Sequence, residues 1–326
     1  MTHSYPAPLH AHIDKFFLRP DIVRRGRVGQ GFPEAISLRG FFMFITTKVL
    51  TSDEKCDILK ETEDFKQERK DPMSLFSIFS KKKKQQPAFD AERFAQRFGY
   101  PYRIYPDKTA ADKAYREAAE EGKRKGFTPI LIPADPQFEN LYLSVSGENG
   151  SVEDILASGA DAEKGRLFLD KRFEDYTSPV NDGTEELDMI SGTYDGEPER
   201  ITGFLSLTGS SGNPVPVILF EIPTANPWEI AAYLPFGGWN ECPEPADMLC
   251  VLRYWYEKYG AVPAAIGDGT LEMVLPSPVS AADADALARE HYAFTPDRVD
   301  QCTNSSTLAE VAASLRVSTV WYFWWD

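Results

Sequence analysis

The last six residues of the sequence, Trp321-Tyr322-Phe323-Trp324-Trp325-Asp326, carry most of the information about the fold. Each of the five rings can bury roughly 150–250 Å², so we expect a strand packed into a core instead of a frayed end. Alternation along a strand places Trp321, Phe323 and Trp325 on one face and the other two rings on the opposite face. A strand that is apolar on both faces is typical of the middle of a covered sheet, and the pattern therefore predicts a central strand.

The residues before this strand alternate between helix and strand patterns. A helix is expected over residues 245–259, and a hairpin turned at Asp268-Gly269 follows it, with strands at residues 261–266 and 270–275. Ser280 and Thr307 are expected to cap two further helices that end near residues 292 and 315. Residues 201–326 thus predict a C-terminal α/β domain of mixed α+β type, with helices flanking a mixed sheet.

Residues 89–200 predict a smaller N-terminal α/β region. Helical spacing recurs at residues 89–98, 109–125, 152–157 and 162–176, and short strands are expected at residues 101–105 and 128–133. Apolar and polar residues alternate at residues 140–146 (NLYLSVS), which predicts another strand. Past a turn-rich, acidic stretch at residues 177–200, strands are expected at residues 201–207, 215–222 and 229–234.

Residues 1–88 differ in composition from the rest. Residues 1–72 hold three of the four histidines and show no consistent helix or strand pattern, so we interpret them as a disordered or non-native extension. The charged residues 66–71 are compatible with purine-rich codons, which suggests a true start at Met73. Residues 73–88 then form a basic leader or linker that contains four lysines, at positions 81–84.

Charge is distributed unevenly along the chain. The net charge is −15, but residues 1–88 hold 16 basic against 11 acidic side chains, whereas residues 89–326 hold 19 against 39. Such an acidic body repels phosphate backbones, so nucleic-acid binding is not expected; a basic protein is the partner that this charge favours. No apolar run approaches the ~20 residues of a membrane span, and no secretion signal is evident, so we expect a cytoplasmic protein; its oligomeric state is not indicated.

The usual catalytic motifs are absent from the sequence. It contains no G-x-G-x-x-G, no P-loop, no H-E-x-x-H and no G-x-S-x-G, and past residue 12 its one histidine is His291. The four cysteines are scattered without a C-x-x-C pair. We therefore predict no cofactor and no metal, and the balance is against an enzyme.

The loop at residues 235–243 (PFGGWNECP) is the first candidate site. Two glycines would let a ligand approach the backbone closely, and Trp239, Asn240 and Glu241 would offer it a ring, an amide and a carboxylate. Cys242 is a candidate nucleophile, although no base stands near it in the sequence. The alternative, which we favour, is a tight connection in which Trp239 packs on the core and Cys242 is a small buried side chain.

A set of carboxylates is the second candidate site. Asp268 and Glu272 lie on the predicted hairpin, Glu290 precedes His291 on the next helix, and Asp297 follows. If the hairpin packs near that helix, the paired acids could perform acid–base chemistry or bind a divalent cation. Turn formation by Asp268 and helix capping by Asp297 are the favoured alternatives.

Four motifs in order resemble a known family. They are residues 235–243 (PFGGWNECP), 253–261 (RYWYEKYGA), 287–292 (LAREHY) and 321–326 (WYFWWD), and together they are similar to the bacterial domain of unknown function 4253 over about residues 215–326. One departure is Thr295, where relatives often carry a cysteine. The resemblance implies a bacterial protein and supplies no activity.

Three function hypotheses remain. The acidic body and the missing catalytic motifs favour a protein-interaction module, of the immunity type that neutralises a basic toxin. The alternatives are a hydrolase-like enzyme that uses Cys242 or the carboxylates, and a small-ligand sensor with a pocket under Trp239.

Overall fold

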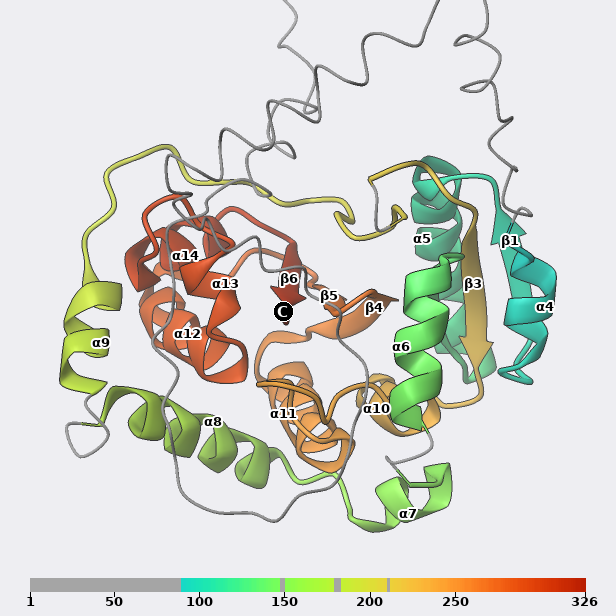
Figure 1. The fold of residues 1–326 in the computed structure, drawn as a ribbon, viewed down its shortest axis with the longest axis horizontal. Helices are drawn as coiled ribbons and strands as arrows, with labels where there is room; N and C mark the ends of the chain where they lie inside the picture. The colour runs from blue at the N-terminus through green and yellow to red at the C-terminus, as the bar shows by residue number, and fades with distance from the viewer. Residues whose placement is uncertain (1–88, 147–149, 179–182, 210–211) are drawn as a thin grey trace, which may run out of the picture. The chain divides into compact units, whose positions relative to one another are not determined.

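The computed structural model describes residues 89–146, 150–178, 183–209 and 212–326, all of which belong to one of the two units into which the chain divides. The expectations for residues 1–72 and 73–88 lie outside the described residues. The described part is an α/β structure in which helices surround one sheet (Figure 1).

The sheet has six strands in the order β1-β3-β2-β4-β5-β6. The parallel pair β2–β4 lies at its centre, and all other neighbours are antiparallel. Strands from both sides of residue 200 therefore contribute to one sheet. The strands are β1 (Tyr102–Tyr105), β2 (Thr128–Pro133), β3 (Val217–Ile222), β4 (Val262–Gly267), β5 (Thr270–Val274) and β6 (Val320–Trp324).

Most helices begin where a capping side chain precedes an amphipathic run. Asp107, Ser280 and Thr307 each accept a hydrogen bond from a main-chain N–H in the first turn of the helix that follows them. Left-handed Gly126 and Gly260 end two of the helices. The helices are α4 (Ala91–Gln96), α5 (Lys108–Lys125), α6 (Pro136–Ser146), α7 (Val152–Ala157), α8 (Ala162–Thr177), α9 (Gly183–Ser191), the 3₁₀ turn η2 (Pro227–Glu229), α10 (Ile230–Tyr233), α11 (Pro245–Tyr259), α12 (Ala281–Phe294), α13 (Asp297–Asp300) and α14 (Leu308–Leu315).

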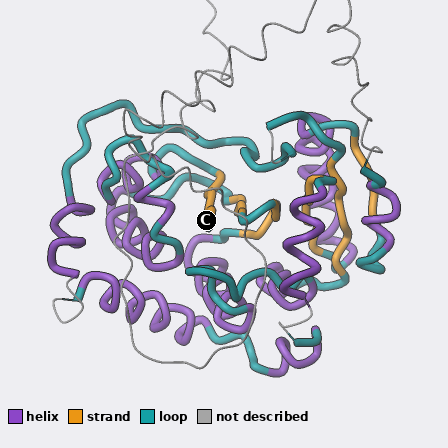
Figure 2. Tube along the Cα trace, in the orientation of Figure 1, coloured by secondary structure: helices purple, strands orange, loops and turns teal. Residues whose placement is uncertain are grey.

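The two faces of the sheet are covered differently. The first, which we call the aromatic face, packs on helices that include α10, α11 and α12, and its rings include Trp255, Trp321 and Phe323. The second, which we call the segment face, is covered by α5 and by residues 200–208, the covering segment. Figure 2 shows this segment within the long loop that leads from α9 to β3.

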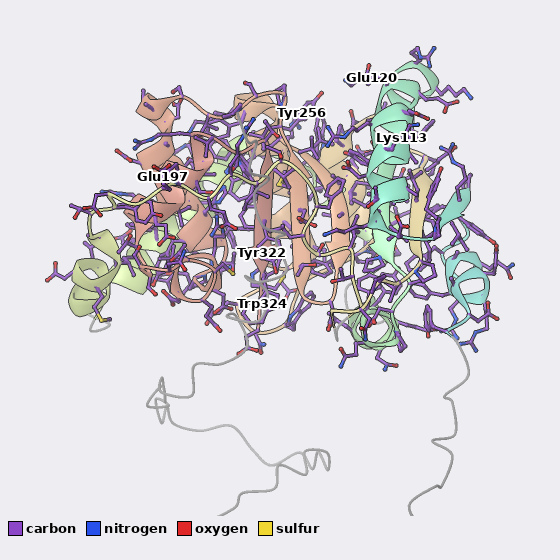
Figure 3. All side chains as sticks on the ribbon, turned by 90° about the horizontal axis from the view of Figure 1, so that it is seen from above. Lys113, Glu120, Glu197, Tyr256, Tyr322 and Trp324 are labelled. Carbon is purple, nitrogen blue, oxygen red and sulfur yellow. The ribbon has the colours of Figure 1, made fainter. Side chains whose placement is uncertain are left out.

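The aromatic strand β6 is an edge strand, which corrects the expectation of a central one. It pairs with β5 alone, from Thr270↔Trp324 to Val274↔Val320. Its rings are nevertheless covered, because Trp321, Phe323 and Trp325 are at most 2% exposed on the aromatic face, while Tyr322 and Trp324 are half-buried on the segment face (Figure 3). Helices and an irregular segment thus cover both faces of β6, although it lies at the edge of the sheet.

Three other strand predictions were wrong. Residues 140–146 lie in helix α6, and residues 229–234 fall in η2 and α10. The covering segment forms no strand. It is held by side-chain acceptors and, at Ile201, by main-chain hydrogen bonds from Thr319 and Val320. The hairpin at Asp268-Gly269 and the helices capped by Ser280 and Thr307 are confirmed. None of the helices in the described ranges is both long and apolar enough to cross a membrane.

Candidate functional site

The loop at residues 235–243 folds back on itself around two glycines. Gly237 (φ +123°) and Gly238 (φ +81°) adopt conformations that favour glycine, and a Cβ on Gly237 would stand 2.0 Å from the Pro243 carbonyl oxygen. The Gly238 N–H reaches the carbonyls of Cys242 and Pro243, at 3.3 and 3.2 Å. The loop is therefore a closed turn with a fixed shape.

This loop is joined to the end of β6 and to α13. The Asn240 side-chain amide donates to the main-chain oxygen of Asp326, and the Asp326 N–H donates to Asp297 Oδ2 at 3.2 Å. Trp239 packs edge-to-face on Phe236, with ring centroids 4.6 Å apart. The predicted residues Trp239, Asn240 and Asp297 are thus brought into one region.

The loop borders an open depression of about 350 Å³. Helix α8 lines one side with Phe168, Arg172, Asp175 and Tyr176. Residues 240–244 and Asp247 of α11 line the other side. Helices α8 and α11 approach closely because residue 165 is a glycine, whose Cβ would stand 2.3 Å from the Cys250 carbonyl oxygen. That close approach positions Arg172 and Tyr176 opposite the loop.

A network of three side chains forms the centre of the depression. The Arg172 guanidinium donates to the Glu241 carbonyl at 2.7 Å and to its carboxylate at 3.4 Å. The Tyr176 hydroxyl donates to the same carboxylate at 2.6 Å, and burial followed by this bond raises the pKa of Tyr176 to about 12. Arg172, whose side chain is 16% exposed, also lies 5.3 Å from the centroids of the Phe168 and Tyr176 rings. Its charge is therefore already matched by Glu241.

The remaining acids of the depression are less well compensated. The carboxylates of Glu244 and Asp247 make no hydrogen bond or ion pair with the described residues, whereas Asp175 pairs with Lys171 at 2.8 Å. Burial raises the pKa of Asp247, and the nearby Arg172 guanidinium opposes that rise. Two unpaired carboxylates on one rim leave the depression with an excess of negative charge.

Cys242 lies at the floor of the depression as a protonated thiol. It is 5% exposed, and burial raises its pKa well above the usual range. The Arg172 guanidinium lowers that pKa, but its influence is smaller than that of burial. Cys242 therefore lacks the thiolate form that a nucleophilic cysteine needs.

His291 and Glu290 lie outside the depression, and both contact Trp255 of α11. His291 is fully buried, with ring centroids 4.6 Å from Phe323 and 4.8 Å from Trp321, and neither ring nitrogen has a partner among the described residues. Burial lowers its pKa well below the usual value, so the imidazole is neutral. Glu290 accepts from the Tyr254 hydroxyl at 2.9 Å and the Trp255 indole at 2.8 Å, which makes it an anchor for α11.

Of the two carboxylates on the hairpin, Glu272 has structural partners, whereas Asp268 makes no hydrogen bond or ion pair with the described residues. Glu272 is fully buried on the segment face and accepts from the N–H groups of Leu205 and Ser206, at 2.7 and 3.0 Å. Burial raises the pKa of Glu272, and the hydrogen bonds from Ser206 and Leu205 lower it to a smaller extent. Asp268 lies at the hairpin turn with its side chain largely exposed. Partial burial of its carboxyl group, followed by the charge of Asp135, raises its pKa. Glu272 and Glu290 are therefore on opposite sides of the sheet and form no acid pair.

Two residues of the depression escaped the sequence reasoning. Arg172 and Tyr176 are four positions apart on α8, so they share a helix face, but nothing in the sequence connects that face with a loop near residue 241. Among the residues that the structure describes, no group of three or more His, Cys, Asp or Glu side chains is arranged to hold a metal ion.

Comparison with known proteins identifies part of the chain. Residues 218–326 match the family model described as domain of unknown function (DUF4253). No curated protein and no solved structure matches. The matched residues include the loop and Asp247, whereas α8 lies outside them.

Proposed function

We propose that this protein, whose residues 218–326 form a DUF4253 domain, is a cytoplasmic binding module that holds a cationic side chain of a basic partner protein in the depression between α8 and the 235–243 loop. The observation that carries the proposal is the pair of uncompensated carboxylates, Glu244 and Asp247, beside an Arg172–Glu241 pair that is already neutral. Glu244 is exposed and Asp247 is half-buried, and a carboxylate without a partner is stabilised by a cation that enters its site.

Long-range electrostatics support the same partner. Residues 89–326 hold 39 acidic against 19 basic side chains, so a positively charged protein would be attracted before contact. The rings of Phe168 and Tyr176 already flank the Arg172 guanidinium, which lies 5.3 Å from each ring centroid, so this wall of the depression is compatible with a guanidinium group next to the carboxylates. If the protein has an immunity role, the basic partner is a toxin that this acidic surface neutralises.

The enzyme alternative has less support from the same contacts. A hydrolase based on Cys242 would need a thiolate and a base within hydrogen-bond reach. Burial keeps this thiol protonated, and the His291 imidazole is walled in by aromatic rings of the core. The depression is therefore better suited to bind a charged group than to transform one.

The test is a titration of the whole chain with a fluorescein-labelled oligoarginine peptide, followed by anisotropy. We expect the double variant Glu244→Gln/Asp247→Asn to weaken binding on the order of tenfold, because it removes both unpaired charges. The matched control is Glu117→Gln/Glu120→Gln on α5, which removes the same charge from two exposed positions outside the depression. Figure 3 labels Glu120 on this helix. The control should weaken binding much less.

Two results would contradict the proposal. Equal weakening by the two double variants would show that the peptide senses net charge alone. Absence of binding even at low ionic strength would remove the attraction on which the proposal depends, since surface electrostatics are strongest there.

A further inference from the structure

Arg298 is a buried cation without a carboxylate partner. It lies on α13 and is 3% exposed. Among the described residues its one hydrogen bond runs from Nη1 to the Cys302 carbonyl oxygen, at 3.3 Å, and its Nε has none. No ion pair to it is found in the described part of the chain. A charge taken out of water in this way is costly unless something compensates it.

The acid next to Arg298 in sequence is committed elsewhere. Asp297 accepts from the Gln301 side chain at 2.5 Å through one oxygen and from the Asp326 N–H at 3.2 Å through the other. The bonds of Asp297 thus hold α13 to the end of β6, while the Arg298 guanidinium is held on the buried side of the same helical turn. The position of the cation is fixed by the fold, and no carboxylate of the described residues forms an ion pair with it, although the charges of Asp297, Glu199 and Asp300 act on the neighbouring Cys302.

Two further donors accompany the guanidinium. Burial raises the pKa of the Cys302 thiol to about 12, and burial followed by the charges of Cys302 and Glu272 raises the pKa of the Tyr322 hydroxyl, while the charge of Arg298 lowers both pKa values. The Tyr322 hydroxyl has no hydrogen-bond partner among the described residues, and α13 packs against β6, the strand that carries it. Tyr322 and Cys302 are both half-buried, so this region is not fully closed to solvent.

We propose that Arg298, together with the Tyr322 hydroxyl, binds an oxyanion: the carboxylate or phosphate group of a small molecule. A guanidinium offers several N–H donors in one plane, which matches the paired oxygens of both groups, and a phenol O–H adds a donor of a different direction. The chain is strongly acidic, so an anion that binds here must be attracted by local donors and not by the overall field. This site is separate from the acidic depression, and either proposal can fail without the other.

The experiment is thermal unfolding of the whole chain in phosphate, in acetate and in chloride, at matched ionic strength and pH. We expect phosphate or acetate to raise the unfolding midpoint of the wild type above its value in chloride, with a rise that grows with concentration as ligand binding requires. The two anions distinguish a phosphate site from a carboxylate site. Because phosphate also stabilises proteins generally, the decisive quantity is the difference between wild type and variant.

Arg298→Met should abolish the anion-specific rise. Tyr322→Phe, which removes one hydroxyl and keeps the ring, should reduce the anion-specific rise. This variant still tests the proposal if Arg298→Met fails to fold. Arg298→Lys should weaken phosphate or acetate binding, measured by calorimetry, on the order of tenfold, because an ammonium lacks the planar donor pair. Arg316→Met is the matched control, since Arg316 is an exposed arginine that pairs with Asp285 at 3.1 Å. The proposal is overturned if the wild type responds to neither anion, or if Arg298→Lys and Tyr322→Phe both keep the full response.

Discussion

The two faces of the sheet bury His291 and Glu272 in opposite ways. On the aromatic face, His291 is surrounded by rings and has no hydrogen-bond partner among the described residues. On the segment face, Glu272 accepts from two main-chain N–H groups and from the Ser206 hydroxyl at 2.6 Å. The aromatic face is therefore held by packing, whereas the segment face is held by a few polar bonds to an irregular stretch of chain.

The contrast between the two faces shows how an edge strand can be buried. Helices cover one side of β6 with regular, interlocking rings, among them the stacked pair Trp255–Phe323, whose centroids are 5.4 Å apart. The covering segment closes the other side through Glu272 and through Ser318, whose hydroxyl accepts from the Ile201 N–H at 2.9 Å. Substitutions on the aromatic face should therefore lower the free energy of unfolding strongly through lost packing. Substitutions on the segment face should instead release the covering segment.

The largest effect is expected from Phe323→Ala. Phe323 is fully buried among Trp255, His291 and Phe294, and truncation of such a ring costs about 3–5 kcal/mol. Urea unfolding measures the loss. Tyr322→Ala is the matched comparison, because the preceding residue of β6 points to the segment face and is half-buried. An equal loss in the two variants would contradict the difference between the faces.

A smaller effect is expected from Glu272→Ala. The variant leaves the Leu205 and Ser206 N–H groups without their acceptor, which costs about 1–3 kcal/mol. Hydrogen exchange at these two amides should accelerate more than exchange in β6, because the covering segment is released before the sheet opens. If exchange accelerates equally in β6, the segment is not a separately held element and the comparison fails.

The smallest effect is expected from pH. The folded pKa of His291 lies below its usual 6.5, so its contribution is fully present above that value and is lost as pH falls below it. The wild type should lose up to about 1.4 kcal/mol per pH unit below this point through His291, because the unfolded chain alone takes up the proton. His291→Phe should lack this dependence.

Chemical denaturation of wild type and His291→Phe above and below pH 6.5 checks the slope. Glu272 acts in the opposite direction, since its raised folded pKa gives stability that is present at low pH and is lost as pH rises through that pKa. The comparison with His291→Phe removes this shared background. Parallel pH profiles for the two proteins would show that His291 is not a buried neutral base.

The sequence predicted the helices and the hairpin well, because caps and turn residues act locally. Ser280, Thr307 and the Asp268-Gly269 turn all perform the roles expected of them. Alternation was less dependable: residues 140–146 alternate and yet complete helix α6, where Pro136 begins the helix and Phe138 is buried in the core. The rings of β6 predicted burial on both sides, but burial does not reveal whether a strand, a helix or a loop supplies the cover.

The candidate site was predictable in part. The glycines and polar residues of the 235–243 loop marked it as unusual, and the structure places Asn240, Glu241 and Cys242 at the depression. The other wall depends on the packing of α8 against α11, a contact between segments some eighty residues apart. No local pattern announces such a contact, so Arg172 and Tyr176 could not be assigned. Adjacent residues also proved to have different roles, since Glu290 accepts a hydrogen bond from the Trp255 indole while His291 packs among aromatic rings.

The most direct test of the proposed function compares two tryptophans in a ¹H–¹⁵N spectrum recorded during titration with the oligoarginine peptide. Trp239 does not itself line the depression but directly precedes the lining residue Asn240, whereas Trp228 lies in η2, packs against Tyr256 with ring centroids 5.0 Å apart, and has no lining residue next to it in the chain. The indole signals can be assigned from Trp239→Phe and Trp228→Phe. The account predicts that the Trp239 signal shifts with peptide concentration while the Trp228 signal stays in place. A Trp239 signal that does not move, or an equal shift of both, would contradict it.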